Sequence, residues 1–301
     1  MIFLKRCSIP FPFIEKGALM RRNLFRNKKP HAIDKRDEKI FYLGMECMPR
    51  PVMLIAAALF VLSISTTSTW AGPPFRTDDP ETVDYKHGEF YVATTFTDNV
   101  GTAKGTVPQF EFNYGILPNV QLHVITPFAF NRMHGGPTTY DFGDLEIGVK
   151  YRFVNIEDGH FMVGTFPLVE APTGDSDRGL GGGHTMFFIP FWLQKDWGEW
   201  TTYGGGGWWR NPGADNKDYW FFGWEVQRDL SKAVTLGAEL FSQTKATNDG
   251  DYEIGFNVGA IINLTDDHHI LFSVGRDFHG DNNFSTYLAY QLTFGPREEK
   301  K

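Results

Sequence analysis

From residue 72 onward, apolar and polar residues alternate with a period of two, and no helical periodicity extends beyond about two turns. The clearest segment is 142–153. One face carries Leu145, Ile147, Val149, Tyr151 and Phe153, and the other carries charged residues or glycine. Successive side chains of a strand point to opposite sides, so one face must meet water and the other a core or lipid. The pattern predicts an all-β body.

Twelve segments of this kind follow one another along the chain. They lie near 87–97, 107–116, 120–130, 142–154, 160–170, 184–195, 199–210, 218–229, 234–245, 251–263, 268–277 and 284–294. Most are about ten residues long, which a tilted strand needs to cross a bilayer. Long Gly/Asp/Asn-rich connections alternate with short ones. This predicts a transmembrane antiparallel up-and-down β-barrel of outer-membrane type, with about 12 strands and both chain ends on the short-turn side.

A soluble β-sandwich would show the same alternation, with its apolar faces turned inward. Aromatic residues near the strand ends favour the barrel, because such residues form interfacial girdles. They are Trp208, Trp209, Tyr219, Trp220, Tyr252 and Tyr290. The last strand ends in alternating apolar residues that close on Phe294, which resembles the C-terminal signal of outer-membrane barrels. The expected partners are therefore outer-membrane lipid and, through Phe294, the barrel-assembly machinery.

The residues before the barrel differ in charge and hydropathy. Residues 1–50 carry 12 Lys/Arg and 5 Asp/Glu, whereas 51–301 carry 17 and 31, a net charge of −14. After Arg50 comes a run of about a dozen apolar residues, too short for a membrane-spanning helix, and then small residues up to Ala71. This order predicts a signal peptide cleaved near Ala71 and a bacterial outer-membrane location. A membrane anchor is the alternative.

The sequence therefore divides into five parts. Residues 1–47 are interpreted as a disordered upstream extension from a start assigned too early, with a basic regulatory arm as the alternative. The signal peptide is 48–71, the periplasmic N-terminal segment 72–86, the barrel 87–294 and the charged C-terminal tail 295–301.

Composition excludes several kinds of chemistry from the body. Both cysteines, Cys7 and Cys47, precede the apolar run, which excludes disulfides and cysteine-based metal or redox sites further on. The acidic body argues against nucleic-acid binding. No G-x-S-x-G element accompanies Ser273 or Ser285, so no enzyme is expected. The pair His268-His269 is interpreted as a polar corner, and neither a metal nor a cofactor is expected.

The polar face of the strands supplies the candidate site. If the alternation holds, the lumen contains charged side chains together with three inward aromatic residues. These candidates are Glu89, Glu111, Asp144, Glu146, Lys150, Arg152, Glu225, Glu239, Glu253, Phe221, Phe241 and Tyr287. A small barrel is nearly filled by its own side chains, so they line either a water-filled route or a plug of salt bridges.

Three segments resemble one known family. The mature N-terminus, 73–82, is Pro-rich with Thr-Asp-Asp-Pro, the hairpin 113–122 contains Tyr-Gly before a short turn, and 141–151 is a Gly-Asp strand. Together they resemble the outer-membrane family named for the meta-pathway of phenol degradation, over roughly 73–294. The resemblance implies an outer-membrane barrel that passes aromatic or other hydrophobic compounds. It carries over no binding residues.

The predicted function is a porin-like channel for passive uptake of small hydrophobic or aromatic compounds. One alternative is a structural or adhesive barrel with a plugged lumen, and another is a lipid-modifying outer-membrane enzyme. The motif Thr77-Asp78-Asp79-Pro80 is expected either to cap the periplasmic end or to enter the lumen.

Overall fold

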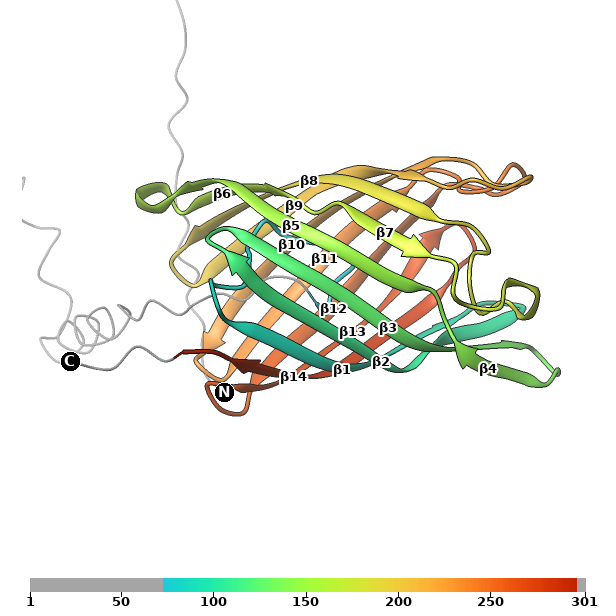
Figure 1. Ribbon diagram of the computed structural model, residues 1–301, viewed down its shortest axis with the longest axis horizontal. Helices are drawn as coiled ribbons and strands as arrows, with labels where there is room; N and C mark the ends of the chain where they lie inside the picture. Colours follow the sequence, from blue (N-terminus) through green and yellow to red (C-terminus); the bar gives the residue numbers. More distant parts are fainter. Residues whose placement is uncertain (1–72, 297–301) are drawn as a thin grey trace, which may run out of the picture. The chain divides into compact units, whose positions relative to one another are not determined.

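The computed structural model describes residues 73–296, which form an antiparallel β-barrel (Figure 1). The predicted upstream extension, the signal peptide and residues 297–301 of the tail lie outside the described residues. The strands are β1 (Gly88–Asp98), β2 (Thr102–Leu117), β3 (Val120–Met133), β4 (Thr138–Phe142), β5 (Leu145–Ile156), β6 (Phe161–Thr165), β7 (Leu168–Ala171), β8 (Met186–Trp197), β9 (Trp200–Arg210), β10 (Tyr219–Ser231), β11 (Val234–Gln243), β12 (Glu253–Asn263), β13 (His268–His279) and β14 (Phe284–Phe294).

Twelve positions around the wall hold these fourteen strands. β4 and β5 both pair with β3, and β6 and β7 both lie between β5 and β8, so each of these two pairs fills one position. The first and last strands pair along their whole length, from Gly88 opposite Phe294 to Asp98 opposite Phe284. The pairing of β3 with β5 completes the ring. The predicted 12-stranded antiparallel barrel is confirmed.

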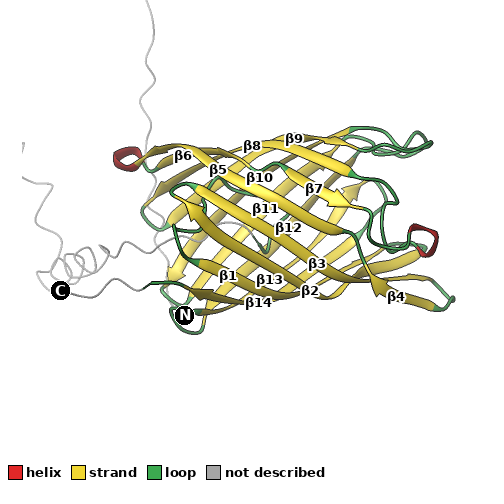
Figure 2. Cartoon of the chain, viewed as in Figure 1, coloured by secondary structure: helices red, strands yellow, loops and turns green. Residues whose placement is uncertain are grey.

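Short turns gather at one end of the barrel, which we call the short-turn end, and the longer loops at the other, the long-loop end (Figure 2). Single-turn 3-10 helices, Glu157–Gly159 and Ser176–Arg178, lie at the two ends. Two expected long connections are short: residues 99–101 join β1 to β2, and 280–283 join β13 to β14. In the first, the ladder continues to Asp98 opposite Ala103, so a polar stretch that resembles a loop in sequence is paired strand.

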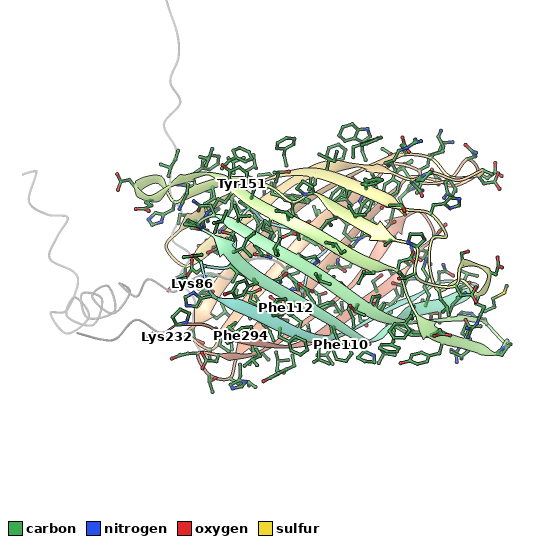
Figure 3. All side chains as sticks on the ribbon, in the orientation of Figure 1. Lys86, Phe110, Phe112, Tyr151, Lys232 and Phe294 are labelled. Carbon is green, nitrogen blue, oxygen red and sulfur yellow. The ribbon has the colours of Figure 1, made fainter. Side chains whose placement is uncertain are left out.

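The outer face of the wall is apolar. On β5, Val149, Tyr151 and Phe153 are exposed, whereas Lys150 between them is buried. Figure 3 shows Phe112, Tyr151 and Phe294 on the outer side of the ribbon. An apolar exterior combined with a polar interior is the arrangement that a barrel needs in lipid. Among residues 73–296, no helix is long and apolar enough to cross a membrane.

Two residues expected in the outer aromatic girdle face inward instead. Trp209 stacks on the buried Phe188, with ring centroids 4.7 Å apart, and Tyr219 stacks on Trp209 at 6.0 Å. Trp208 and Trp209 are consecutive residues of β9, so the alternation that exposes one turns the other into the lumen.

Apolar side chains inside the barrel form two clusters. The aromatic cluster consists of Phe166, Phe188, Trp192, Phe221 and Phe241, with Leu168 and Trp209 packed against it. The second cluster consists of Tyr91, Ala93, Ile261, Leu271 and Ala289, with Tyr287 packed against it. Every strand sends alternate side chains inward, so residues far apart in sequence meet across the lumen.

The outer face predicts how the barrel responds to a charge. Val258, in the middle of β12, is 46% exposed on the apolar side. Val258→Arg should destabilise the barrel in phospholipid vesicles by about 2–4 kcal/mol, because the guanidinium then sits at the bilayer midplane. Urea titration with heat-modifiable gel migration measures this. Asp249→Arg, in the loop between β11 and β12, should change little, and equal effects of the two substitutions would contradict a lipid-facing Val258.

Candidate functional site in the lumen

We call the N-terminal residues before β1, Pro73–His87, the lumen segment: residues 73–83 lie inside the barrel, and Asp84–Lys86 are exposed at the short-turn end (Figure 1). Thr77 and Asp79 have no exposed surface, and Val83 is buried. The motif Thr77-Asp78-Asp79-Pro80 was expected either to cap the periplasmic end or to enter the lumen, and in the structure it lies in the lumen. The segment touches strands far from it in sequence, such as β3, β5, β11 and β13.

The carboxylate of Glu239, on β11, holds the middle of the lumen segment. The backbone N–H of Arg76 donates to Glu239 Oε1 at 2.8 Å, and the N–H of Thr77 donates to Oε2 at 2.8 Å. The Thr77 hydroxyl also donates to Oε2, at 2.6 Å, and the side-chain amide of Asn257 donates to Oε1. Four donors therefore satisfy a carboxylate that is only 2% exposed.

The Arg76 side chain links the lumen segment to the aromatic cluster. Its guanidinium carbon lies 4.2 Å from the ring centroid of Phe241 and 5.5 Å from that of Phe221. The same guanidinium forms an ion pair with Glu253 of β12. An arginine can stack on an aromatic face while its edge binds a carboxylate, so one residue contacts three sequence-predicted candidates.

Lys150, on β5, pairs with the two aspartates of the lumen segment. Its Nζ donates to Asp78 Oδ1 at 2.9 Å and lies 3.6 Å from Asp79 Oδ1. Burial raises the pKa of Asp79 well above its usual range, and the Lys150 ammonium opposes that rise. The lysine is 4% exposed, so this is a buried ionic cluster in which each charge depends on its partner.

Glycines make room for the lumen segment. A Cβ atom on Gly223 of β10 would lie 2.0 Å from Thr77 Oγ1, and one on Gly115 of β2 would lie 2.1 Å from the Asp84 carbonyl oxygen. The segment is further fixed by the N–H of Val83, which donates to Gln121 Oε1 at 2.8 Å. These close approaches explain part of the high glycine content of the polar face.

A second polar network lies on β1, β2, β3 and β5. Its hydrogen bonds join Tyr91 to Glu89 (2.8 Å), Asn113 to Glu111 (2.9 Å), His123 Nδ1 to Asn113 Oδ1 (2.6 Å), and His123 Nε2 to Glu146 Oε1 (2.9 Å). Three predicted carboxylates, Glu89, Glu111 and Glu146, thus belong to one network around His123 and Asn113. The inward parity of Tyr91, Asn113 and His123 was the signal that could have identified them.

The other candidates are scattered. Asp144 accepts from the N–H groups of Gly174 and Gly182, at 2.9 and 2.6 Å, so it orders the loop between β7 and β8. Arg152 donates to Asn119 Oδ1 at 2.9 Å. Glu225 has no exposed surface, and among residues 73–296 neither of its carboxylate oxygens has a hydrogen-bond partner. Within the same residues, no three metal-binding side chains come together to hold an ion.

A cavity of about 980 Å³ runs alongside the lumen segment. At the short-turn end its lining includes His268, Phe294 and Pro296, and inside the barrel it reaches Phe166 and Leu168 of the aromatic cluster. The cavity is within the size range of small-molecule sites in proteins. It offers a solute a polar entrance and an apolar inner end.

Comparisons with known proteins agree with the fold. A similar solved structure is the COG4313 outer membrane channel from Pseudomonas putida F1, at 16% identity and a TM-score of 0.61, covering 75% of this chain and 100% of that one. The KdgM porin aligns at 12% identity and a TM-score of 0.49, covering 68% and 99%. No family model matches the chain, and no curated protein matches it. At 16% identity, the likeness to the COG4313 channel shows an outer-membrane-type barrel fold.

The buried ionic cluster predicts the effect of losing its cation. Lys150→Met leaves the buried Asp79 and the half-buried Asp78 without their partner, which costs about 3–5 kcal/mol if the lumen segment stays in place. We expect the segment to leave instead, so that ion conductance in planar bilayers rises while the barrel stays folded. Lys150→Arg, which keeps the charge, should conduct like the parent. So should Lys104→Met, at an exposed lysine of β2, and unchanged conductance of Lys150→Met would contradict this role.

The lumen segment should also respond to pH. Burial raises the pKa of Glu81 to about 7, opposed by a hydrogen bond from Gln194. The inserted segment favours the protonated carboxyl, whose pKa is 4.5 when the segment is released, so insertion weakens as pH rises from about 4.5 to about 7. Conductance should therefore increase across that range. Glu81→Gln should abolish the increase, and a variant that retained the full pH dependence would exclude Glu81 as its source.

Proposed function

We propose that the chain is an outer-membrane channel for passive uptake of small hydrophobic or aromatic molecules, and that the lumen segment narrows it. The observation that carries the proposal is the cavity beside the lumen segment, which extends from the short-turn end to the aromatic cluster. The charges around it bind one another: Lys150 pairs with Asp78, and Arg76 with Glu253. A solute therefore meets aromatic side chains and charges that are already paired, rather than unpaired charges of one sign.

The short-turn end faces the periplasm in this proposal. Both β1 and β14 have their chain-terminal ends there, and outer-membrane barrels place their short turns on the periplasmic side. A signal peptide ending near Ala71 would lead directly to the lumen segment. The outer face would contact membrane lipid, and Phe294, exposed at the end of β14, would be recognised by the assembly machinery.

The aromatic character of the inner end supports the proposed solute class. Phe221 and Phe241, two of the predicted inward aromatics, lie under the Arg76 guanidinium, with their ring centroids 6.5 Å apart. Phe166 of the same cluster lines the cavity. An apolar solute that reaches this end gains dispersion contacts with Phe166 and loses water-exposed surface on binding.

A closed barrel with a structural role is the second candidate. The observation that favours it is the buried contact of the lumen segment with Glu239 and Lys150, which obstructs the lumen. The enzymatic alternative gains no support from Ser273, because its hydroxyl donates to the Pro74 carbonyl at 2.6 Å and so serves to pack the lumen segment.

Removal of the lumen segment tests the proposal. Deleting residues 73–86 should raise both ion conductance in planar bilayers and the influx of N-phenyl-1-naphthylamine, an apolar aromatic dye, into Gram-negative cells that produce the protein. Whole cells are needed for the dye because it crosses plain phospholipid vesicles unaided, whereas a lipopolysaccharide surface excludes it.

The control is a shortening of the exposed loop between β11 and β12 by residues 245–250, which should alter neither measurement. The parent chain should already admit more dye than cells without it. If neither the parent nor the deletion variant admits dye beyond that background, with folding verified by heat-modifiable migration, the structural candidate replaces the channel.

A further inference from the structure

The cavity beside the lumen segment ends against one side chain of the aromatic cluster. Of the five residues at the centre of that cluster, only Phe166 also lines the cavity. The residue is 5% exposed, so its neighbours hold it on nearly every side. Phe166 therefore lies at the boundary between the cavity and the rest of the aromatic cluster.

The chain around Phe166 places its ring directly beyond the lumen segment. Gly164, Phe166 and Leu168 are alternate residues, and all three face the inside of the barrel. Gly164 makes room for the lumen segment, since a Cβ atom there would lie 2.9 Å from Pro80 Cβ. The next inward position toward the long-loop end carries the Phe166 ring. On this part of the wall, a solute that leaves the cavity meets this ring first.

A recess in the neighbouring strand receives the ring. β5 and β7 lie side by side in the wall (Figure 1), and Gly148 of β5 pairs with Leu168. A Cβ atom on Gly148 would lie 2.7 Å from Phe166 Cε2 and 2.4 Å from Leu168 Cδ2. Any larger residue at this position would push the ring away from the wall and into the lumen. A glycine inside a strand is typical of such a close approach.

His123 and Lys150 hold the ring in this recess. His123, the partner of Gly148 on β3, packs edge-on against the ring, with centroids 5.1 Å apart and planes at 85°. The Lys150 ammonium lies 5.0 Å from the ring centroid. Both kinds of contact depend on the direction in which the ring faces, so together they favour one orientation. Because Lys150 also pairs with Asp78, the ring is linked to the lumen segment.

We propose that Phe166 is the specificity-determining residue of the channel, because its ring limits the width of the path from the cavity to the aromatic cluster. The inference rests on the proposed channel function and adds a size class: apolar solutes narrow enough to pass beside the recessed ring. Side chains nearly fill the interior of a small barrel, so the position of one ring changes the free width strongly. Gly148 sets that position from the wall, and Lys150 sets it from the lumen segment.

Truncation of the ring tests the width limit. The probes are N-phenyl-1-naphthylamine and Nile red, a wider fused-ring dye, given separately to Gram-negative cells that produce the full chain. Phe166→Ala should raise the influx of Nile red severalfold relative to that of N-phenyl-1-naphthylamine. Phe166→Leu, which leaves a smaller cavity and so disturbs folding less, should change the ratio in the same direction. Phe222→Ala, at a phenylalanine that is 48% exposed on the outer face of β10, is the matched control and should leave the ratio unchanged.

A methyl group on the floor of the recess tests the same width in the opposite direction. Gly148→Ala should displace the ring into the path and lower the influx of N-phenyl-1-naphthylamine. In the Phe166→Ala background there is no ring to displace, so the same substitution should lose most of its effect. Gly101→Ala, where a Cβ atom meets nothing within 4 Å, is the control and should leave influx unchanged. Heat-modifiable migration verifies that each variant is folded.

The outcomes separate the two proposals. If the parent admits N-phenyl-1-naphthylamine and the ratio of the two influxes is unchanged in folded Phe166→Ala and Phe166→Leu, the width limit is overturned and the channel stands. Equal effects of Gly148→Ala in both backgrounds would also overturn it, because Leu168 rather than the ring would then set the width. Absence of dye influx in the parent overturns the channel function itself.

Discussion

Buried charge is the constraint on which the rest of this structure depends. A 12-stranded barrel turns half of each strand inward, and here those positions carry Glu239, Lys150 and other ionisable residues in a narrow space. An ionised group without a partner in such a place costs several kcal/mol. The lumen segment supplies the partners, because its backbone N–H groups bind Glu239 and its aspartates bind Lys150.

This dependence works in both directions. The segment binds through polar groups such as those of Thr77 and Asp78, so its attachment depends on the charges and glycines of the wall, Gly223 among them. The barrel in turn needs a polar strand of chain to satisfy its interior. The charges of a barrel interior assembled in this way are paired with the lumen segment, and the aromatic cluster lies next to them.

Glycine and proline have different effects on the two faces of the barrel wall. Glycine on the inner face allows the lumen segment to approach, whereas proline in β8 removes a ladder bond and leaves an apolar pocket on the lipid side. The barrel tolerates missing backbone pairing with β8 at residues 165–167, because the paired stretches that end at Gly164 and begin at Leu168 keep the same register. The hydrogen bonds between the other strands of the closed barrel therefore hold the wall together where these bonds are missing.

The sequence by itself determined the twelve strand positions of the wall and the alternation of inward and outward side chains along them. These properties follow from period-two alternation, which is a local property of the backbone. It misassigned Trp209 to the girdle, where strict alternation would have corrected it, and it did not name His123 as a candidate, although this residue bonds to Asn113 and Glu146.

Only the tertiary structure decided where the lumen segment lies, because its position depends on strands more than 150 residues away, as in the contact of Thr77 with Glu239, at a separation of 162. The sequence could name Thr77-Asp78-Asp79-Pro80 but could not choose between a cap and the lumen. The same limit applies to the apolar pocket on the outer face of the wall, lined by Ile147, Pro167 and Ile189, since these residues become neighbours only when β5, β7 and β8 pair. Local pattern specifies a strand, and closure of the barrel specifies what its faces meet.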